Sequence, residues 1–291
     1  MLKRSFISEK RPLLLGLFGQ VIALALSLGP AWSLDSGWAE AEGGRMRLVI
    51  DPVTRDNGTL AGFLDIDLEP GWKTYWRDPG SAGIPPMLDF SQSQGIAFEV
   101  MHFPPPVRVD DGYAIWAGYT APVQLPLIFK LTASGEAHIR AQAFIGICEK
   151  ICVPFQAEFI IEVPADMAAD PSVSQAVDAA FARLPAAAGT DFNIEKAVVD
   201  TTGKQLTIAA RLPAFRPSGV APELFVAGPE GFAFAPPKLT SDNDGLAEWS
   251  VRVETPSGMV TEGDAVPLDI VVTLGQRAVE QSVSVSLVAK N

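Results

Sequence analysis

Residues 137–163, AHIRAQAFIGICEKICVPFQAEFIIEV, contain the clearest structural pattern of the chain. Apolar and polar residues alternate in 137–144 and again in 156–163, as is typical of strands with one buried face. The chain must turn between these two runs, in a short segment that holds both of its cysteines, Cys148 and Cys152. Pro154 follows the second cysteine and helps to end the turn. The sequence therefore predicts two neighbouring strands joined at the cysteine pair.

Similar short alternating runs, separated by Gly, Pro, Asn and Asp, continue on both sides of this segment and predict an all-β sandwich or barrel fold. The predicted strands are 45–50, 60–68, 96–103, 123–131, 192–200, 204–212, 223–228, 247–254, 267–275 and 278–289. Residues 69–122 are rich in aromatics, Pro and Gly and, apart from 96–103, are predicted to form long loops. One stretch, ADPSVSQAVDAAFARLP (169–185), has helical periodicity, with Asp170 as N-cap and Pro171 at the first helical position.

The fold class predicted is thus all-β, with two tandem immunoglobulin-like β-sandwich domains joined by a short amphipathic helix. Basic residues followed by an apolar run predict a signal peptide over 1–41, cleaved after Ser33 or after Ala41. The cysteine-bearing sandwich is predicted over 42–165, the helix and an Ala-rich linker over 166–189, and the second sandwich over 190–291. We expect an exported protein with no stable membrane span after cleavage.

Composition restricts the function further. The formal net charge is -12, which argues against nucleic acid as a partner. Two sandwiches of this size bury enough apolar surface without many disulfides, so bulk stability does not require the cysteines.

The spacing of the cysteines leaves three readings open: a structural clip, a redox couple or a metal site. In an extended chain the two residues would lie about 13 Å apart, beyond the roughly 7 Å limit for a disulfide, so a bond between them requires a turn. A disulfide that closes five residues contributes only about 2 kcal/mol by chain entropy. Short-loop disulfides are also the more exchangeable kind.

A metal site would use the soft thiolates for Cu(I) or Zn, with His102 or Met101 as further ligands. Neither histidine of the chain, His102 or His138, stands at ligand spacing from the cysteines, and His138 reads as a half-exposed structural residue of its strand. We therefore expect no metal and no cofactor.

Three motifs in this order, GWKTYWRDPG (71–80), DDGYAIWAGY (110–119) and GICEKICVP (146–154), resemble the N-terminal periplasmic domain of the DsbD and ScsB family of thiol–disulfide reductant conductors. The resemblance covers roughly 45–163, and in the ScsB-like branch two tandem sandwiches are similar to the whole predicted mature chain. It implies a periplasmic, soluble protein without cofactor.

By this resemblance, Cys152 forms the mixed disulfide with partners and Cys148 resolves it. Asp110, Asp111 and Tyr113 occupy the place of a cap loop that shields the pair, and Tyr75 matches an aromatic that lines the site. The chain departs from the family in two respects. Three residues separate its cysteines instead of five, and Gly112 replaces the capping Phe.

The function implied is periplasmic thiol–disulfide exchange, a protein-disulfide reductase activity if the pair is active. The donor would be a thioredoxin-like protein or a DsbD/CcdA-type membrane conductor, and the acceptor a periplasmic protein that carries a disulfide. The alternative is a non-catalytic protein-binding module with a structural disulfide, and a third reading is a copper chaperone. Deep burial of both sulfurs would favour the binding module, whereas an exposed pair would favour exchange.

Overall fold

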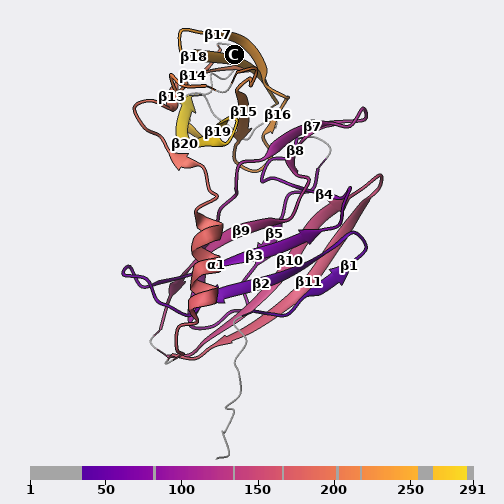
Figure 1. Cartoon of the computed structure of the whole chain (residues 1–291), viewed down its shortest axis with the longest axis vertical. Coiled ribbons are helices and arrows are strands. Elements are labelled where there is room, and N and C mark those ends of the chain that lie inside the picture. Colours follow the sequence, from indigo (N-terminus) through magenta and orange to yellow (C-terminus); the bar gives the residue numbers. More distant parts are fainter. Residues whose placement is uncertain are drawn as a thin grey trace, which may run out of the picture. The chain divides into compact units, whose positions relative to one another are not determined.

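The structure is a computed structural model that describes residues 35–80, 83–133, 135–165, 167–200, 203–216, 218–254 and 265–286. It consists of two β-sandwiches and one helix, so the predicted all-β fold class is confirmed (Figure 1). Both sandwiches belong to one compact unit. Most of the predicted signal peptide, residues 1–34, lies outside the described residues.

The first sandwich has two antiparallel sheets, in the orders β1-β2-β3-β9-β6 and β11-β10-β4-β8-β7, with β5 also paired to β10. Its strands are β1 (Ala39–Ala41), β2 (Gly44–Asp51), β3 (Thr59–Leu68), β4 (Lys73–Tyr75), β5 (Met87–Asp89), β6 (Ile96–Met101), β7 (Val107–Asp110), β8 (Ile115–Tyr119), β9 (Val123–Leu131), β10 (Ala137–Cys148) and β11 (Cys152–Val163).

The second sandwich has sheets in the orders β12-β20-β19-β15 and β13-β14-β18-β16, and β17 pairs with β18. Its strands are β12 (Ala186–Ala187), β13 (Asn193–Val199), β14 (Gln205–Arg211), β15 (Glu223–Ala227), β16 (Ala233–Phe234), β17 (Lys238–Asn243), β18 (Leu246–Glu254), β19 (Ala265–Leu274) and β20 (Arg277–Ser286).

The alternation seen in the sequence places one face of each long strand in a core. Along β10, Ile139, Ala141 and Ile145 are fully buried, while Arg140 and Gln142 between them face solvent. This strand and its partner β11 are longer than predicted, because IGIC and CVPF continue the ladder as far as the cysteines. Pro154 accordingly lies inside β11 rather than ending the turn. β11 is an edge strand, where a residue without an N–H is tolerated.

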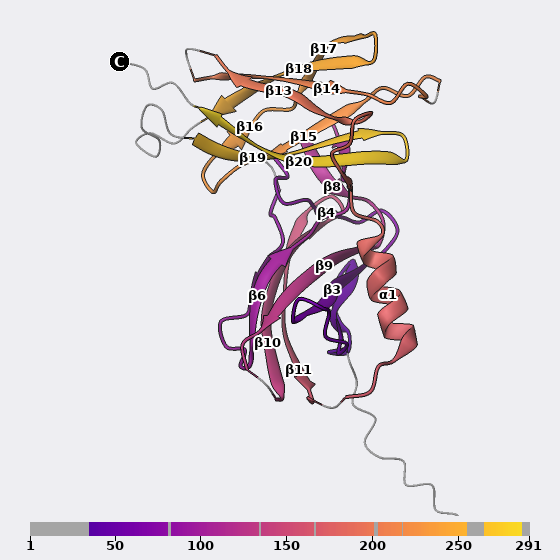
Figure 2. The same cartoon turned by 90° about the vertical axis from the view of Figure 1, so that its left-hand side faces the viewer.

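The helix α1 (Pro171–Phe181) begins as predicted, with the Asp170 side chain accepting a hydrogen bond from the Ser172 amide. Val177 and Ala180 are buried against Val49 and Phe63 of the first sandwich. Figure 2 shows α1 lying along the sheet that contains β3 and β9. The helix therefore covers an outer sheet face as well as connecting the two sandwiches.

Two predicted irregular regions contain strands. The stretch 69–122 forms β4, β5, β7 and β8 in addition to the predicted strand that became β6, and the Ala-rich linker contributes β12, which pairs in parallel with β20. These strands are two to five residues long, too short for a period to be recognised.

The sandwiches contact each other through side chains of the segment after β4 and of β15, β19 and β20. Trp76 packs edge-on against Phe225 with ring centroids 5.9 Å apart. Arg77 forms ion pairs with Asp269 at 3.1 Å and with Glu280 at 2.5 Å. Figures 1 and 2 both show β4 and β8 at the end of the first sandwich next to the second.

Candidate functional site

The cysteines close the hairpin of β10 and β11. Cys148 is the last residue of β10, Cys152 is the first of β11, and the two are direct partners across the ladder. Their Cα atoms are 4.1 Å apart and their sulfurs are bonded. The three-residue turn of Glu149, Lys150 and Ile151 thus brings together two residues that an extended chain would hold apart.

The disulfide has one buried and one exposed side. Cys148 is only 1% exposed and packs with Tyr75 and Trp116, with Ile84 and Val109 beside them. Cys152 is an exposed residue, and its neighbour Ile151 at the hairpin tip is 78% exposed. The Cys152 side of the disulfide is therefore the side nearer to solvent.

Tyr75 contacts both sulfurs. Its hydroxyl oxygen lies 3.0 Å from the Cys148 Sγ and 3.2 Å from the Cys152 Sγ. The ring lies over Gly146 of β10, where an added Cβ would be 3.2 Å from the ring carbons. Burial, and then the charge of Asp111, raises the pKa of Tyr75, so the phenol stays protonated at neutral pH and can donate to sulfur.

Trp116 is held against Tyr75 by a charged pair on its other side. The two rings meet edge-on, 5.9 Å apart at 83°. The Trp116 Nε1–H donates to the Asp111 Oδ2 at 3.1 Å, and the Lys73 Nζ donates to the same oxygen at 2.6 Å. The Lys73 ammonium also lies 4.5 Å from the centroid of Trp116. These contacts fix the indole and hence the position of the tyrosine ring.

Asp111 also organises the loop that joins β7 and β8. Its Oδ1 accepts hydrogen bonds from the amides of Tyr113 and Ala114. The hydrogen bond from Lys73, followed by those from the two amides, lowers the pKa of Asp111 well below its usual value. Asp110 accepts a hydrogen bond from the amide of Gly112, which has a φ of +82°.

The predicted site residues are therefore placed as follows. Cys148, Cys152 and Tyr75 are in direct contact, and Asp111 connects to them through Trp116. Asp110 contributes to the loop, through its hydrogen bond from the Gly112 amide. Tyr113 lies in the same loop, but its side chain is 99% exposed, so the tryptophan rather than this tyrosine packs beside the tyrosine–disulfide group.

Lys73 was not predicted as a site residue. It is the β4 partner of Cys148, and its side chain is 13% exposed. The stretch KTY that contains it alternates in the manner of a strand, but three residues are too few to reveal which side chains share a face.

The histidines lie elsewhere. His102 follows β6 in the other sheet, and its ring packs edge-on against Phe181 of α1. His138 is half-exposed and pairs with Glu162 across the hairpin, at the end opposite to the cysteines. Glu136, His138 and Glu162 have potential ligand atoms within 4.8 Å of one another, separate from the disulfide.

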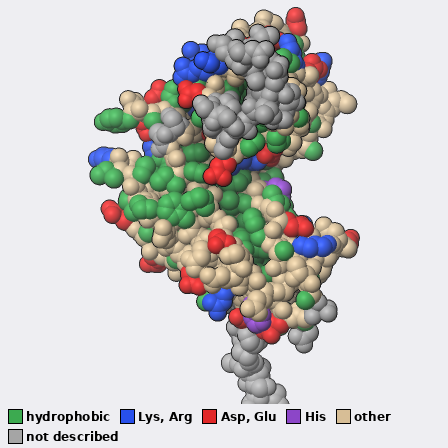
Figure 3. Space-filling model, turned by 180° about the vertical axis from the view of Figure 1, so that it is seen from behind, with side chains coloured by type: hydrophobic (Ala, Val, Ile, Leu, Met, Phe, Trp, Pro, Cys, Tyr) green, Lys and Arg blue, Asp and Glu red, His purple; other side chains and the backbone are tan. Residues whose placement is uncertain are grey.

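Hydrophobic side chains gather across the middle of one face of the molecule (Figure 3). Large exposed apolar side chains of the first sandwich include Met87, Val107, Tyr113 and Ile151. Within the described residues, none of the helices has the length and apolar character that crossing a bilayer requires.

Comparison with known families gives two matches. Residues 49–164 match the family "Thiol:disulfide interchange protein DsbD, N-terminal", and residues 183–287 match a domain of unknown function, DUF8393. No curated protein matches the chain. The first match contains the whole of the site described above, and places the Cys148–Cys152 disulfide in a module of thiol–disulfide interchange type.

Among solved structures, the crystal structure of the N-terminal periplasmic domain of ScsB from Proteus mirabilis is similar, with a TM-score of 0.67 and 20% sequence identity. The alignment covers 88% of this chain and 99% of that one. The crystal structure of the conserved domain protein from Bacillus anthracis aligns at 11% identity with a TM-score of 0.25, and the alignment covers 88% of this chain and 90% of that one. The resemblance predicted from the sequence is confirmed: the cysteine-bearing sandwich matches the DsbD N-terminal family, and the chain has the fold of the ScsB N-terminal periplasmic domain.

Proposed function

We propose that this protein relays reducing equivalents by dithiol–disulfide exchange through Cys148 and Cys152. The observation that carries the proposal is the asymmetry of the disulfide. One sulfur belongs to an exposed residue at a hairpin tip, the other to a buried residue, and a tyrosine hydroxyl lies within hydrogen-bond distance of both. A disulfide used only as a clip has no need of an approachable side.

The reaction starts with the thiolate of a reduced donor, which attacks the Sγ of Cys152. The Cys148–Cys152 bond breaks, its electron pair moves to the Sγ of Cys148, and a mixed disulfide joins the donor to Cys152. The second thiol of the donor then attacks the donor sulfur that is bonded to Cys152. This forms the donor disulfide and releases Cys152 as a thiol. The protein gains two electrons and two protons, and the donor leaves as a disulfide.

The reverse steps reduce an acceptor. Cys152 as a thiolate attacks the acceptor disulfide, and Cys148 then attacks the Sγ of Cys152 to release the acceptor as a dithiol. The reaction is that of a protein-disulfide reductase. No metal or cofactor takes part in any of these steps.

Tyr75 stabilises the thiolate that leaves. A thiolate at Cys148 forms in a buried environment, where an uncompensated charge is costly. The phenol donates a hydrogen bond to it at the distance now seen to the Cys148 sulfur, 3.0 Å. The indole of Trp116 holds the phenol in this position.

The partners proposed are a thioredoxin-like protein or a DsbD/CcdA-type membrane conductor as donor, and a periplasmic protein with a disulfide as acceptor. The exposed apolar side chains of Ile151 and Tyr113 suit contact with another protein surface. The N-terminal domain of ScsB, which this chain resembles in fold, is periplasmic.

We further propose export to the periplasm, with the signal peptide cleaved after Ser33 rather than after Ala41. Asp35 forms a bridge with Val49, and β1 pairs with β2 through Ala39–Ala41. Cleavage after Ser33 keeps this strand in the mature protein, whereas cleavage after Ala41 removes it.

The exposure of Cys152 weighs against the alternative of an inert clip in a binding module. The copper-chaperone reading requires His102 or Met101 beside the thiols. Both belong to the β6 side of the other sheet, and the structure gives this reading no support.

The test is the reduction potential of the pair, measured by equilibrating the purified protein in glutathione or dithiothreitol buffers and counting free thiols. Exchange proteins lie at roughly -120 to -270 mV, and we expect a value in this range. The rate of reduction by reduced thioredoxin, used as a model donor, is measured in parallel. A potential well below about -300 mV, together with no reaction with thioredoxin, would replace the proposal with the clip.

A further inference from the structure

The second sandwich packs against the back of the layer that lines the disulfide. This layer consists of β4, β8 and β7, which follow β10 in the sheet order. Because side chains alternate along a strand, each of these strands presents one residue to the disulfide and the next to the opposite side.

The residues on the front of the layer are Tyr75, Trp116 and Val109, all in the group around Cys148. The next residue along the chain from Tyr75, Trp76, packs against Phe225 of the second sandwich. Val109 and Trp116 are partners across β7 and β8, and so are Arg108 and Ala117 behind them. The register thus separates a front that faces the disulfide from a back that faces the second sandwich.

Arg108 of β7 also connects the two sides of this boundary. It donates a hydrogen bond to the main-chain oxygen of Leu224 at 2.6 Å, and its guanidinium lies 4.7 Å from the centroid of the Phe225 ring. Burial lowers the pKa of Arg108, but the nearby Glu223 and Asp78 favour its charged form.

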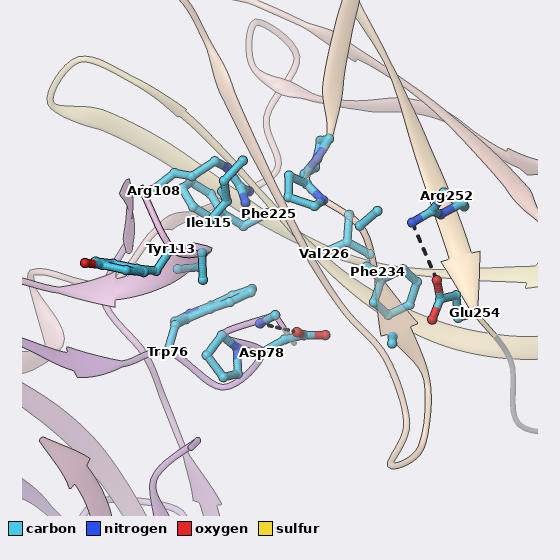
Figure 4. A pocket seen from close by; sticks show the side chains of 18 residues that line it. Trp76, Asp78, Arg108, Tyr113, Ile115, Phe225, Val226, Phe234, Arg252 and Glu254 are labelled. Carbon is cyan, nitrogen blue, oxygen red and sulfur yellow. Dashed lines mark hydrogen bonds and ion pairs between the residues drawn. The ribbon is translucent and has the colours of Figure 1, made fainter. Parts of the chain in front are cut away.

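A cavity of about 320 Å³ lies beside this connection. Ile115 and Ala117 line it from the first sandwich, and Val226 and Phe234 from the second. Figure 4 shows Arg108 next to Phe225 and Ile115, with Trp76 nearby and Phe234 farther across the cavity. Close packing is interrupted here, and Arg108 of β7 lies at the edge of the cavity, in contact with the second sandwich.

We infer that the second sandwich supports the redox site, and that Arg108 is a positioning residue which anchors β7 to it and so holds Trp116 and Tyr75 against Cys148. This inference rests on the proposed function and assigns a role to the second sandwich. Arg108 itself does not touch the sulfurs. It acts through the layer formed by β4, β8 and β7. Its removal weakens the hydrogen bond that the Tyr75 hydroxyl donates to the leaving thiolate of Cys148.

The experiment compares Arg108→Met with Arg140→Met, a matched control. Arg140 is an exposed arginine of β10 whose nearest acidic partner, Glu158, is 3.9 Å away. The rate constant for reduction of the native disulfide by dithiothreitol is measured in the full-length mature protein. We expect a drop of about two- to thirtyfold for Arg108→Met, the range of couplings carried through packed networks, and none for the control.

A double-mutant cycle identifies the route. If Arg108 acts through Tyr75, Arg108→Met causes no further loss of rate when Tyr75→Phe is already present. Arg108→Lys keeps a donor and a charge but loses the planar guanidinium, so it should recover part of the native rate. Thermal unfolding of each variant verifies that it is folded at the assay temperature. If Arg108→Met is unfolded there, Arg108→Lys replaces it in the cycle.

A native rate for Arg108→Met, or an equal loss with and without Tyr75, would overturn the inference. These outcomes are distinct from failure of the proposed function, in which the native protein itself has a potential below the exchange range and does not react with thioredoxin.

Discussion

Two long hairpins, one in each sandwich, differ in how their ends are closed. β19 and β20 pair from Ala265 and Ser286 to Leu274 and Arg277, and the chain reverses at Gly275 without any covalent bond. β10 and β11 pair over a similar length and also reverse tightly, yet they carry a disulfide at the last pair.

Both hairpins have strands with fully buried apolar side chains, such as Ile139 and Ile145 in β10 and Ile270 and Val272 in β19. Hydrogen bonding and burial therefore suffice to hold a hairpin of this kind in this molecule. A disulfide that closes five residues adds at most about 2 kcal/mol by chain entropy. The comparison supports the exchange role proposed for the cysteines, and the following variants test it.

The largest effect is expected for single cysteine variants. Both Cys148→Ser and Cys152→Ser should abolish catalytic exchange, but only Cys148→Ser, which leaves the exposed Cys152, should accumulate a stable mixed disulfide with a disulfide-bearing probe such as oxidised glutathione. Mass spectrometry of the intact protein measures this adduct. Urea unfolding should show a loss of no more than about 2 kcal/mol in either variant. A much larger loss would mean that the hairpin depends on its disulfide.

Tyr75→Phe should slow reduction by dithiothreitol about 10- to 150-fold, the equivalent of the 1.5–3 kcal/mol that a hydrogen bond to a charged group contributes. The matched control is Tyr119→Phe. That tyrosine is also buried, but its hydroxyl donates to the main-chain oxygen of Pro104 at 2.8 Å. The control should lose stability and keep its rate, and equal slowing in both variants would remove the assigned role of Tyr75.

A substitution in the turn of the β19–β20 hairpin should affect stability and not the exchange rate, the reverse of the cysteine variants. Gly275 has a φ of +61°, a conformation that costs other residues about 1–2 kcal/mol. Gly275→Ala should therefore lower the free energy of unfolding by about this amount and leave the exchange rate unchanged. A changed rate would show that the turn of the second sandwich is coupled to the disulfide.

The smallest effect concerns the titration of Asp111. Its lowered pKa means that the stabilisation by this carboxylate is complete above the usual value of 3.8 and is lost only as the pH falls through the lowered value. Carbon-13 NMR of the side-chain carboxyl should give a midpoint below 3.8. Lys73→Met should move that midpoint upward, because the hydrogen bond from Lys73 is the largest cause of the shift. A midpoint that does not move would contradict the ion pair as its origin.

The alternation of the long strands was sufficient to predict both sandwiches and the cysteine hairpin, because burial of one face dictates a period of two. It was not sufficient for β4, β7 and β8, whose lengths hide any period. The neighbours of Cys148 come from these strands, in an order across the sheet that differs from the order along the chain. Tyr75 was therefore found only through the motif that contains it, and Lys73 was missed.

The exposure of Tyr113 shows a second limit of prediction from sequence, which concerns the direction of side chains in loops. The sequence placed it correctly in the loop after β7, but side chains in a loop have no period from which to infer direction. Trp116, two residues into β8 and therefore in a strand, points at the site because its backbone is fixed by pairing with Val109.

The adjacency of Tyr75 and Trp76 also restricts how the length of this segment can vary. The first faces the disulfide and the second faces Phe225, so a deletion or insertion of one residue within 73–76 would exchange the two faces. The phenol would leave the sulfurs at the same time as the indole left the second sandwich. Among homologous sequences, changes in length are expected in the turns on either side of this segment, and within it only in steps of two residues.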